Sequence, residues 1–163
     1  PVIVQVFIIY YGVFGIVQLP SFQILGFIKF SRFFPGVVAL GMNSGAYLCE
    51  IIRAGIGAVD RGQWEAARSI GLSQRHVMTR VILPQAVKNI LPALCNECIS
   101  TVKGTSLASV FFVGELMTSF KTVQSATFLA LQSLTIVGVI YFLLNFILSR
   151  LLMCIERRFA LSD

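Results

Sequence analysis

Long apolar segments alternate with shorter polar segments along this chain of 163 residues. The apolar segments cover residues 1–19, 33–56, 88–113 and 126–149, and the polar connections are 20–32, 57–84 and 114–125, with a tail at 150–163. A helix needs about 20 apolar residues to cross a bilayer. The pattern therefore predicts an all-α membrane protein, a helical bundle of about four spans, with residues 1–163 in one transmembrane domain.

Composition agrees with this fold class. Hydrophobic residues make up 56% of the chain and charged residues 12%, whereas soluble domains carry about 25% charged residues. The four cysteines, Cys49, Cys95, Cys98 and Cys154, lie in or beside apolar segments, as small buried hydrophobic residues do. The single pair Cys95 and Cys98 has no second pair and no nearby histidine, so we expect no metal site.

The basic residues are distributed unevenly, although the net charge is only +6. Nine flank or occupy the central connection and the tail, three occupy the other connections, and Lys103 lies inside an apolar segment. The nine are Arg53, Arg61, Arg68, Arg75, Arg80, Lys88, Arg150, Arg157 and Arg158, and the three are Lys29, Arg32 and Lys121. This asymmetry predicts that the central loop and the C-terminus are cytoplasmic. Because the charges flank spans and form no stripe on a soluble face, nucleic-acid binding is not expected.

The third apolar segment carries the charges that a span normally lacks. Glu97 and Lys103 lie inside it, and Gly104, Thr105 and Ser106 interrupt its apolar character. A charge at mid-membrane costs roughly 2.5–3.5 kcal/mol on insertion scales and needs a partner or a polar cavity.

Glu97 is accordingly the first candidate for a substrate pathway, where a carboxylate suits a cationic or α-ammonium group. Asn43, Ser44 and Gln132 are weaker candidates for the same cavity. The alternative is a structural pair between Glu97 and Lys103, which a spacing of six residues places on different faces of a regular helix. For Lys103 a structural role and a carboxylate-binding role both stay open. Glu115 is expected in solvent at the outer mouth.

The central loop, residues 57–84, is the most polar part of the chain. Trp64, Ala67, Ile70 and Gly71 recur at helical spacing and predict a short helix with an apolar stripe. Such a helix can insert into a groove on a partner protein or lie on the membrane surface, and the residues alone leave both open. Gly71 suits the end of a helix, and Pro84 suits the start of the next one or a break before it.

Within this loop, Glu65, Ala66 and Ala67 are followed four residues on by Gly71, and the residues from Val81 to Pro84 read VILP. The pattern resembles the EAA loop of ABC-importer permeases and departs from it at Val81, where the family has isoleucine. Residues 1–12, 43–56 and 103–107 resemble the polar amino acid uptake permeases. The resemblance covers nearly the whole chain and omits the family's N-terminal span and the first part of the next span.

The resemblance implies a transport subunit that is not an enzyme, in the bacterial cytoplasmic (inner) membrane. Its expected partners are ABC ATPase subunits, a second permease subunit identical or different, an extracytoplasmic solute-binding protein and membrane lipid. No cofactor is expected in this chain, because ATP and magnesium would bind the ATPase. The residues implied in coupling to the ATPase are Glu65, Ala66, Ala67, Gly71, Leu83 and Pro84.

The implied cargo is a polar amino acid of the arginine, histidine, lysine or glutamine type. Relatives often carry aspartate at the position of Gly104, so the cationic preference of this chain stays open. Two alternatives also remain. The same fold could carry a different small solute, or the chain could be a membrane scaffold or signalling subunit that does not transport.

Overall fold

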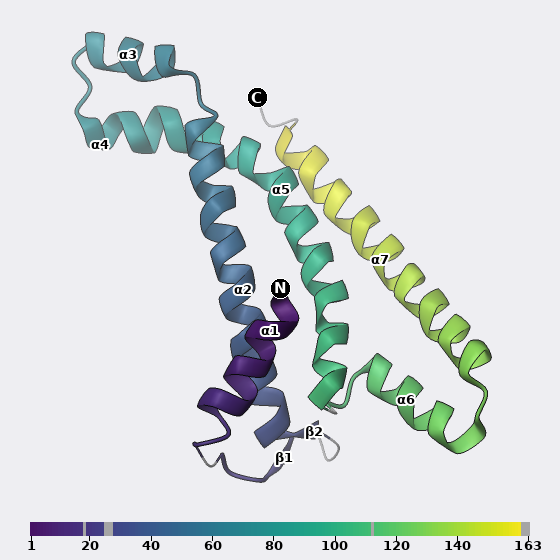
Figure 1. Ribbon diagram of the computed structural model, residues 1–163. Coiled ribbons are helices and arrows are strands. Elements are labelled where there is room, and N and C mark those ends of the chain that lie inside the picture. Colours follow the sequence, from purple (N-terminus) through teal and green to yellow (C-terminus); the bar gives the residue numbers. More distant parts are fainter. Residues whose placement is uncertain (18, 25–27, 112, 161–163) are drawn as a thin grey trace. The chain divides into compact units, whose positions relative to one another are not determined.

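The computed structural model describes residues 1–17, 19–24, 28–111 and 113–160 of the chain (Figure 1). Over these residues the chain is mostly helical, with turns and irregular connections between the helices. Two short antiparallel strands, β1 (Gln23–Ile24) and β2 (Ile28–Lys29), pair Gln23 with Lys29. The predicted all-α fold class is confirmed. The chain forms two compact units, one of Pro1–Ser44 with Ile99–Leu148 and one of Gly45–Cys98 with Ser149–Asp163.

The first two apolar segments form helices whose limits differ from the predicted ones. α1 (Val2–Phe7) continues as the π-helix η1 (Ile8–Val13), so the first helix stops well before the predicted end at residue 19. Gly15 lies in the turn that follows, and a Cβ at this position would collide with the backbone carbonyl of Tyr11. α2 (Phe30–Gly57) begins three residues before the predicted start at residue 33.

The central loop contains α3 (Arg61–Ser69) and α4 (Gln74–His76), and α4 leads through the π-helix η2 (Val77–Ile82) into α5 (Leu83–Gly104). Pro84 was predicted at the start of a helix or at a break before it, and it is the second residue of α5, directly after the π-helix η2. The helical backbone nevertheless continues through it. Proline crowds the carbonyl four residues earlier, and the π-helical turns directly before Pro84 interrupt the regular ladder there.

The third predicted span is shifted, because α5 begins before residue 88 and ends at Gly104. The sequence predicted one span through residue 113, whereas a 3₁₀-helix, η3 (Thr105–Phe111), starts at the polar residues that interrupt the apolar segment. The Thr105 and Ser106 hydroxyls donate to the carbonyls of Val102 and Lys103, both at 2.7 Å. These side chains satisfy carbonyls that the ending helix leaves without partners.

The third connection and the tail are more ordered than the sequence predicted. Residues 114–125, expected to be a simple connection, contain most of α6 (Leu116–Thr127). α7 (Ala130–Ala160) begins after the predicted residue 126 and continues through most of the basic tail. Among the described residues, one helix, Ala130–Arg157, is long and apolar enough to cross a membrane, and Val2–Val13 is a shorter apolar helix.

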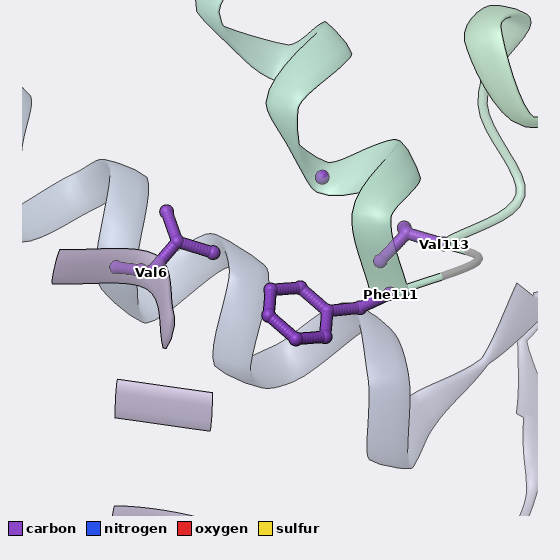
Figure 2. Packing of buried hydrophobic residues seen from close by; sticks show 5 residues of the cluster. Val6, Phe111 and Val113 are labelled. Carbon is purple, nitrogen blue, oxygen red and sulfur yellow. The ribbon is translucent and has the colours of Figure 1, made fainter. Parts of the chain in front are cut away.

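Each unit has its own buried cluster. In the first unit Val6, Ala39, Ala108, Phe111 and Val113 form the core, and Figure 2 shows the Phe111 ring directed toward Val6. Tyr10 stacks on Phe111 with ring centroids 3.8 Å apart. In the second unit the cluster consists of Val59, Ala67, Val77, Ile82 and Ala86.

Candidate functional site

The loop segment that carries the EAA-like pattern folds as a helical hairpin, here called the loop hairpin (residues 61–82). α3 and the helix formed by α4 and η2 lie side by side (Figure 1). Ala67 of α3 packs with Val77 and Ile82 of η2, which are fully buried. Burying such apolar side chains stabilises the hairpin through its own core.

Both ends of α3 are capped by local chemistry. The Asp60 carboxylate accepts a hydrogen bond from the amide of Gly62 at 2.7 Å, the usual way to satisfy a free amide at a helix start. At the other end Gly71 has a φ of +82°, a region that glycine enters without steric cost. The Gly71 amide donates to the Arg68 carbonyl and the Leu72 amide to the Ala67 carbonyl. This is a Schellman motif, so the predicted role of Gly71 as a helix end is confirmed.

The predicted apolar stripe of α3 is wrong as a single surface. Ala67 is buried and Trp64 packs against the hairpin core, whereas Ile70 is 76% exposed and Gly71 is exposed. The reason is that the hairpin folds back on itself, so the apolar side of α3 packs against η2 and is not available to a partner. The surface open to a partner is the other side of α3, with Glu65, Ala66 and Ile70.

The hairpin core is continuous with the ends of the long helices. Val59, which follows α2, and Ala86 of α5 belong to the same buried cluster, with Ile56 and Ile90 packed against it. A Cβ added to Gly55 would collide with the Ile90 side chain, so α2 and α5 approach closely here. Interiors are close-packed and transmit strain, and the hairpin shares its packed core with the ends of α2 and α5.

Two other glycines of α2 show no such close approach. A Cβ at Gly41 or Gly45 would meet nothing within 4 Å. Gly55, closer to the loop, provides the close approach instead. Leu83 and Pro84, the last residues of the EAA-like pattern, are exposed in the first turn of α5.

An open hollow of ≈ 440 Å³ lies in the first unit and is here called the Lys103 cavity. It is lined by Lys103, Ser106, Gly138, Tyr141, Phe142 and Asn145. Asn145 donates from Nδ2 to the carbonyl of Tyr141 at 2.7 Å. The Lys103 ammonium and the Asn145 amide supply donors for a carboxylate. The hydroxyls of Ser106 and Tyr141 already donate their one hydrogen, to the Lys103 carbonyl and to Glu115.

The other candidate pathway residues have different surroundings. The Ser44 hydroxyl is 3.0 Å from that of Thr101, and Asn43 beside it is half-buried on α2. Gln132 is exposed on α7, and nine residues place it on the side of this helix opposite Tyr141. Glu97 is half-buried on α5 and belongs to the second unit. The roles of these residues stay predictions.

Glu115 differs from its prediction as a solvated residue at the mouth. It is half-buried and caps α6, accepting from the amides of Met117 at 2.8 Å and Thr118 at 2.7 Å. The Tyr141 hydroxyl also donates to it, at 3.2 Å. This carboxylate therefore joins α6 to the wall of the Lys103 cavity.

The sequence analysis did not select Tyr141 and Asn145 as candidate site residues, because both are uncharged and lie in an apolar segment that contains no charge. Their spacing of four, on one face of a predicted span, was the available signal. Among the described residues no group of three or more His, Cys, Asp or Glu side chains could hold a metal ion.

Comparison with known proteins agrees with this geometry. The chain is 40% identical to the arginine transport system permease protein ArtQ of Bacillus subtilis, over 100% of this chain and 70% of that protein. It is 36% identical to a putative glutamine transport system permease protein GlnP of Rickettsia bellii, over 99% and 70%. It is 38% identical to the nopaline transport system permease protein NocM of Agrobacterium fabrum, over 96% of this chain and 65% of that protein.

A solved structure described as an amino acid ABC transporter with histidines matches with a TM-score of 0.85 and 42% identity. The match covers 97% of this chain and 69% of that chain. The resemblance to ABC-importer permeases is therefore confirmed at the level of both sequence and fold.

A family model described as binding-protein-dependent transport system inner membrane component matches residues 1–161. Members of this family are transport subunits and not enzymes, and they work with a solute-binding protein and a separate ATPase. The chain belongs to the family of inner membrane components of binding-protein-dependent transport systems.

Proposed function

We propose that this chain is the permease subunit of an ATP-driven, binding-protein-dependent importer of polar amino acids. The observation that carries the proposal is the loop hairpin, a capped helical knob with its own core inside a chain of this family. Relatives named for arginine and glutamine transport support the substrate class.

In this proposal the ATPase subunit docks on the exposed side of α3. Glu65, Ala66 and Ile70 make the contact, and Gly71 fixes where the helix ends. Ala67, whose side chain is buried, acts by holding α3 on η2. Closure of the ATPase on ATP would push the hairpin, and the packed contact of Gly55 with Ile90 would pass the movement to α2 and α5.

The proposed orientation places the central loop and the C-terminus in the cytoplasm, because most basic residues flank those segments. The complete transporter would contain a second permease subunit, identical or different, and surrounding lipid. ATP and magnesium would be held by the ATPase.

The proposed substrate pathway includes the Lys103 cavity of the first unit. Glu97, Asn43, Ser44 and Gln132 are proposed as further pathway residues, each on its sequence pattern alone. Lys103 would bind the substrate carboxylate, since its ammonium lines the cavity beside Ser106 and Tyr141. Glu97 would bind an α-ammonium or a cationic side chain. Gly104 carries no carboxylate to add a second negative charge, so neutral substrates such as glutamine are compatible as well.

A different small solute is the second candidate, and the nopaline and octopine permeases among the relatives favour it. These names differ from arginine and glutamine while the identity stays at 38% and 35%. A non-transporting scaffold has no such observation in its favour.

The test is uptake into proteoliposomes that hold the full-length permease with its ATPase and binding protein. ATP-dependent accumulation of labelled arginine, histidine or glutamine is expected, and Lys103→Gln should raise the substrate concentration for half-maximal uptake. Uptake of an opine instead of these amino acids would move the cargo to the second candidate. A complex with no solute-dependent ATP hydrolysis for any of them would contradict the transporter proposal.

A further inference from the structure

The membrane-spanning helix α7 is longer than the apolar part of a bilayer. Its span Ala130–Arg157 has 28 residues, and at about 1.5 Å each these extend about 42 Å. The hydrocarbon core is about 30 Å thick. With Ala130 at one boundary, roughly the last eight residues, from Arg150 to Arg157, lie in the headgroup layer of the other leaflet.

The two sides of α7 differ along this whole length. One side is buried or half-buried and faces the protein, through Ser133, Val137, Tyr141, Asn145, Leu148, Leu152 and Glu156. Near the end of the span Cys95 of α5 contacts this side, with its Sγ 4.0 Å from the Leu152 carbonyl. At 100° per residue, Arg150 and Arg157 point to the opposite side, away from Glu156.

On that opposite side Arg150, Met153, Cys154 and Arg157 line an open hollow of ≈ 140 Å³. The two arginines are seven residues apart, about 10.5 Å along the axis, and exposed Met153 and Cys154 form the floor between them. Toward the membrane the same side continues as exposed apolar residues, Ile136, Val139, Leu143 and Phe146.

We propose that this side of α7 binds an anionic phospholipid, with the phosphate between Arg150 and Arg157 and an acyl chain along the apolar residues above it. Guanidinium groups match phosphate oxygens with paired donors. Juxtamembrane basic residues gain affinity from anionic headgroups. The length of α7 places Arg150 and Arg157 at headgroup depth, and their positive charge fits a phosphate. The exposed apolar side of α7 fits an acyl chain of the lipid. The inference depends on the membrane location and not on the proposed cargo.

The test uses the full-length permease purified with its partner subunits in mild detergent, stripped of lipid and given phosphatidylglycerol and phosphatidylcholine with identical acyl chains. Native mass spectrometry counts the lipids retained. The wild type should prefer phosphatidylglycerol, and the double variant Arg150→Gln with Arg157→Gln should lose roughly 30-fold in this preference, about fivefold for each arginine.

A second variant, which moves one arginine without changing the net charge, distinguishes a specific lipid site from general electrostatic attraction to anionic lipid. The variant Arg150→Leu with Leu151→Arg keeps the net charge at nearly the same depth and turns one arginine by 100° away from Arg157. Leu151 is 59% exposed, so the exchange leaves the core alone. We expect the exchange to lose several-fold of the preference while elution volume and helix content match the wild type.

Four results would overturn the proposal. The exchange variant could keep the wild-type preference, or the wild type could have none. Displacement of the lipid by excess inorganic phosphate would mean a site for free phosphate. Loss of the ATPase from the glutamine variant with an unchanged lipid count would identify the surface as a protein contact.

Discussion

The two buried clusters of this protein are built in opposite ways. The cluster in the second unit draws on residues 56–90, a single short stretch of chain, and consists of small and aliphatic side chains with Trp64 at its edge. The cluster in the first unit joins residues near positions 6, 39 and 111, and aromatic rings surround it. The loop hairpin is stabilised by contacts between residues that are close in sequence, whereas the first unit depends on contacts between segments that are far apart in sequence.

The comparison also explains where the candidate roles fall. The hairpin core continues into α2 and α5, as the proposed transmission of movement from the ATPase requires. The Lys103 cavity lies in the unit with the non-local core, between polar side chains of η3, α5 and α7. The proposed coupling element and the proposed binding site are thus built with different kinds of packing, and the following variants probe each.

The largest effect is expected from Ala67→Asp, which places a carboxylate in the hairpin core. An unpaired buried charge costs about 3–5 kcal/mol, so both the thermal midpoint and the recovery of the ATPase in co-purification should fall. The matched control is Ala66→Asp on the exposed side of the same helix. It should keep the thermal midpoint and still weaken ATPase recovery. Equal thermal midpoints for the two variants would contradict the assignment of inner and outer sides.

The next effect is expected from Gly55→Ala, because its Cβ would collide with Ile90. Overpacking of this kind costs about 1–3 kcal/mol, measured as a lower thermal midpoint of the purified permease. Gly57→Ala is the control, since its Cβ would meet nothing within 4 Å. Ile90→Ala added to Gly55→Ala should restore part of the loss, and no restoration would argue against the close approach of α2 and α5.

A smaller effect is expected from Gly71→Ala at the end of α3. A side chain in the left-handed region costs about 1–2 kcal/mol, which should loosen the hairpin and reduce the ATP hydrolysis that substrate-loaded binding protein stimulates. Gly71→Asn should lose less, because asparagine tolerates this conformation. If alanine and asparagine behave alike, the positive φ is not what the position requires.

The smallest effect is expected in the first unit from Tyr141→Phe, which removes the hydrogen bond to Glu115. A typical intramolecular hydrogen bond contributes about 0.5–1.5 kcal/mol, and at 3.2 Å we expect the lower end for this bond. The readout is the thermal midpoint together with half-maximal substrate concentration for uptake. Tyr47→Phe, on the exposed side of α2, should change neither.

The sequence was most informative where structure is local. The helix end at Gly71 follows from the conformational limits of a single residue, and the structure has it. The inner side of α3 could not be predicted, because it depends on η2 folding back onto Ala67. The stripe pattern shows that a helix has an apolar side and not what that side meets.

The cavity was predictable only in part. Lys103 stood out because a charge inside an apolar segment needs a reason. Tyr141 and Asn145 did not, since uncharged polar groups in a span are less costly and their cavity forms through contacts across the chain. Helix α6 was also missed, because its first turn depends on the Glu115 carboxylate, which looked like a solvated charge.

Photo-crosslinking from the loop hairpin tests the central claim most directly. A benzoylphenylalanine at Ile70, which is 76% exposed, should crosslink to the ATPase subunit in native membranes, whereas the same group at Thr135 on α7 should not. Ile70 crosslinks that weaken when ATP is removed would further show that the contact follows the ATPase cycle. Crosslinks from Ile70 to lipid alone, in membranes that contain the assembled ATPase, would contradict the coupling role of the hairpin.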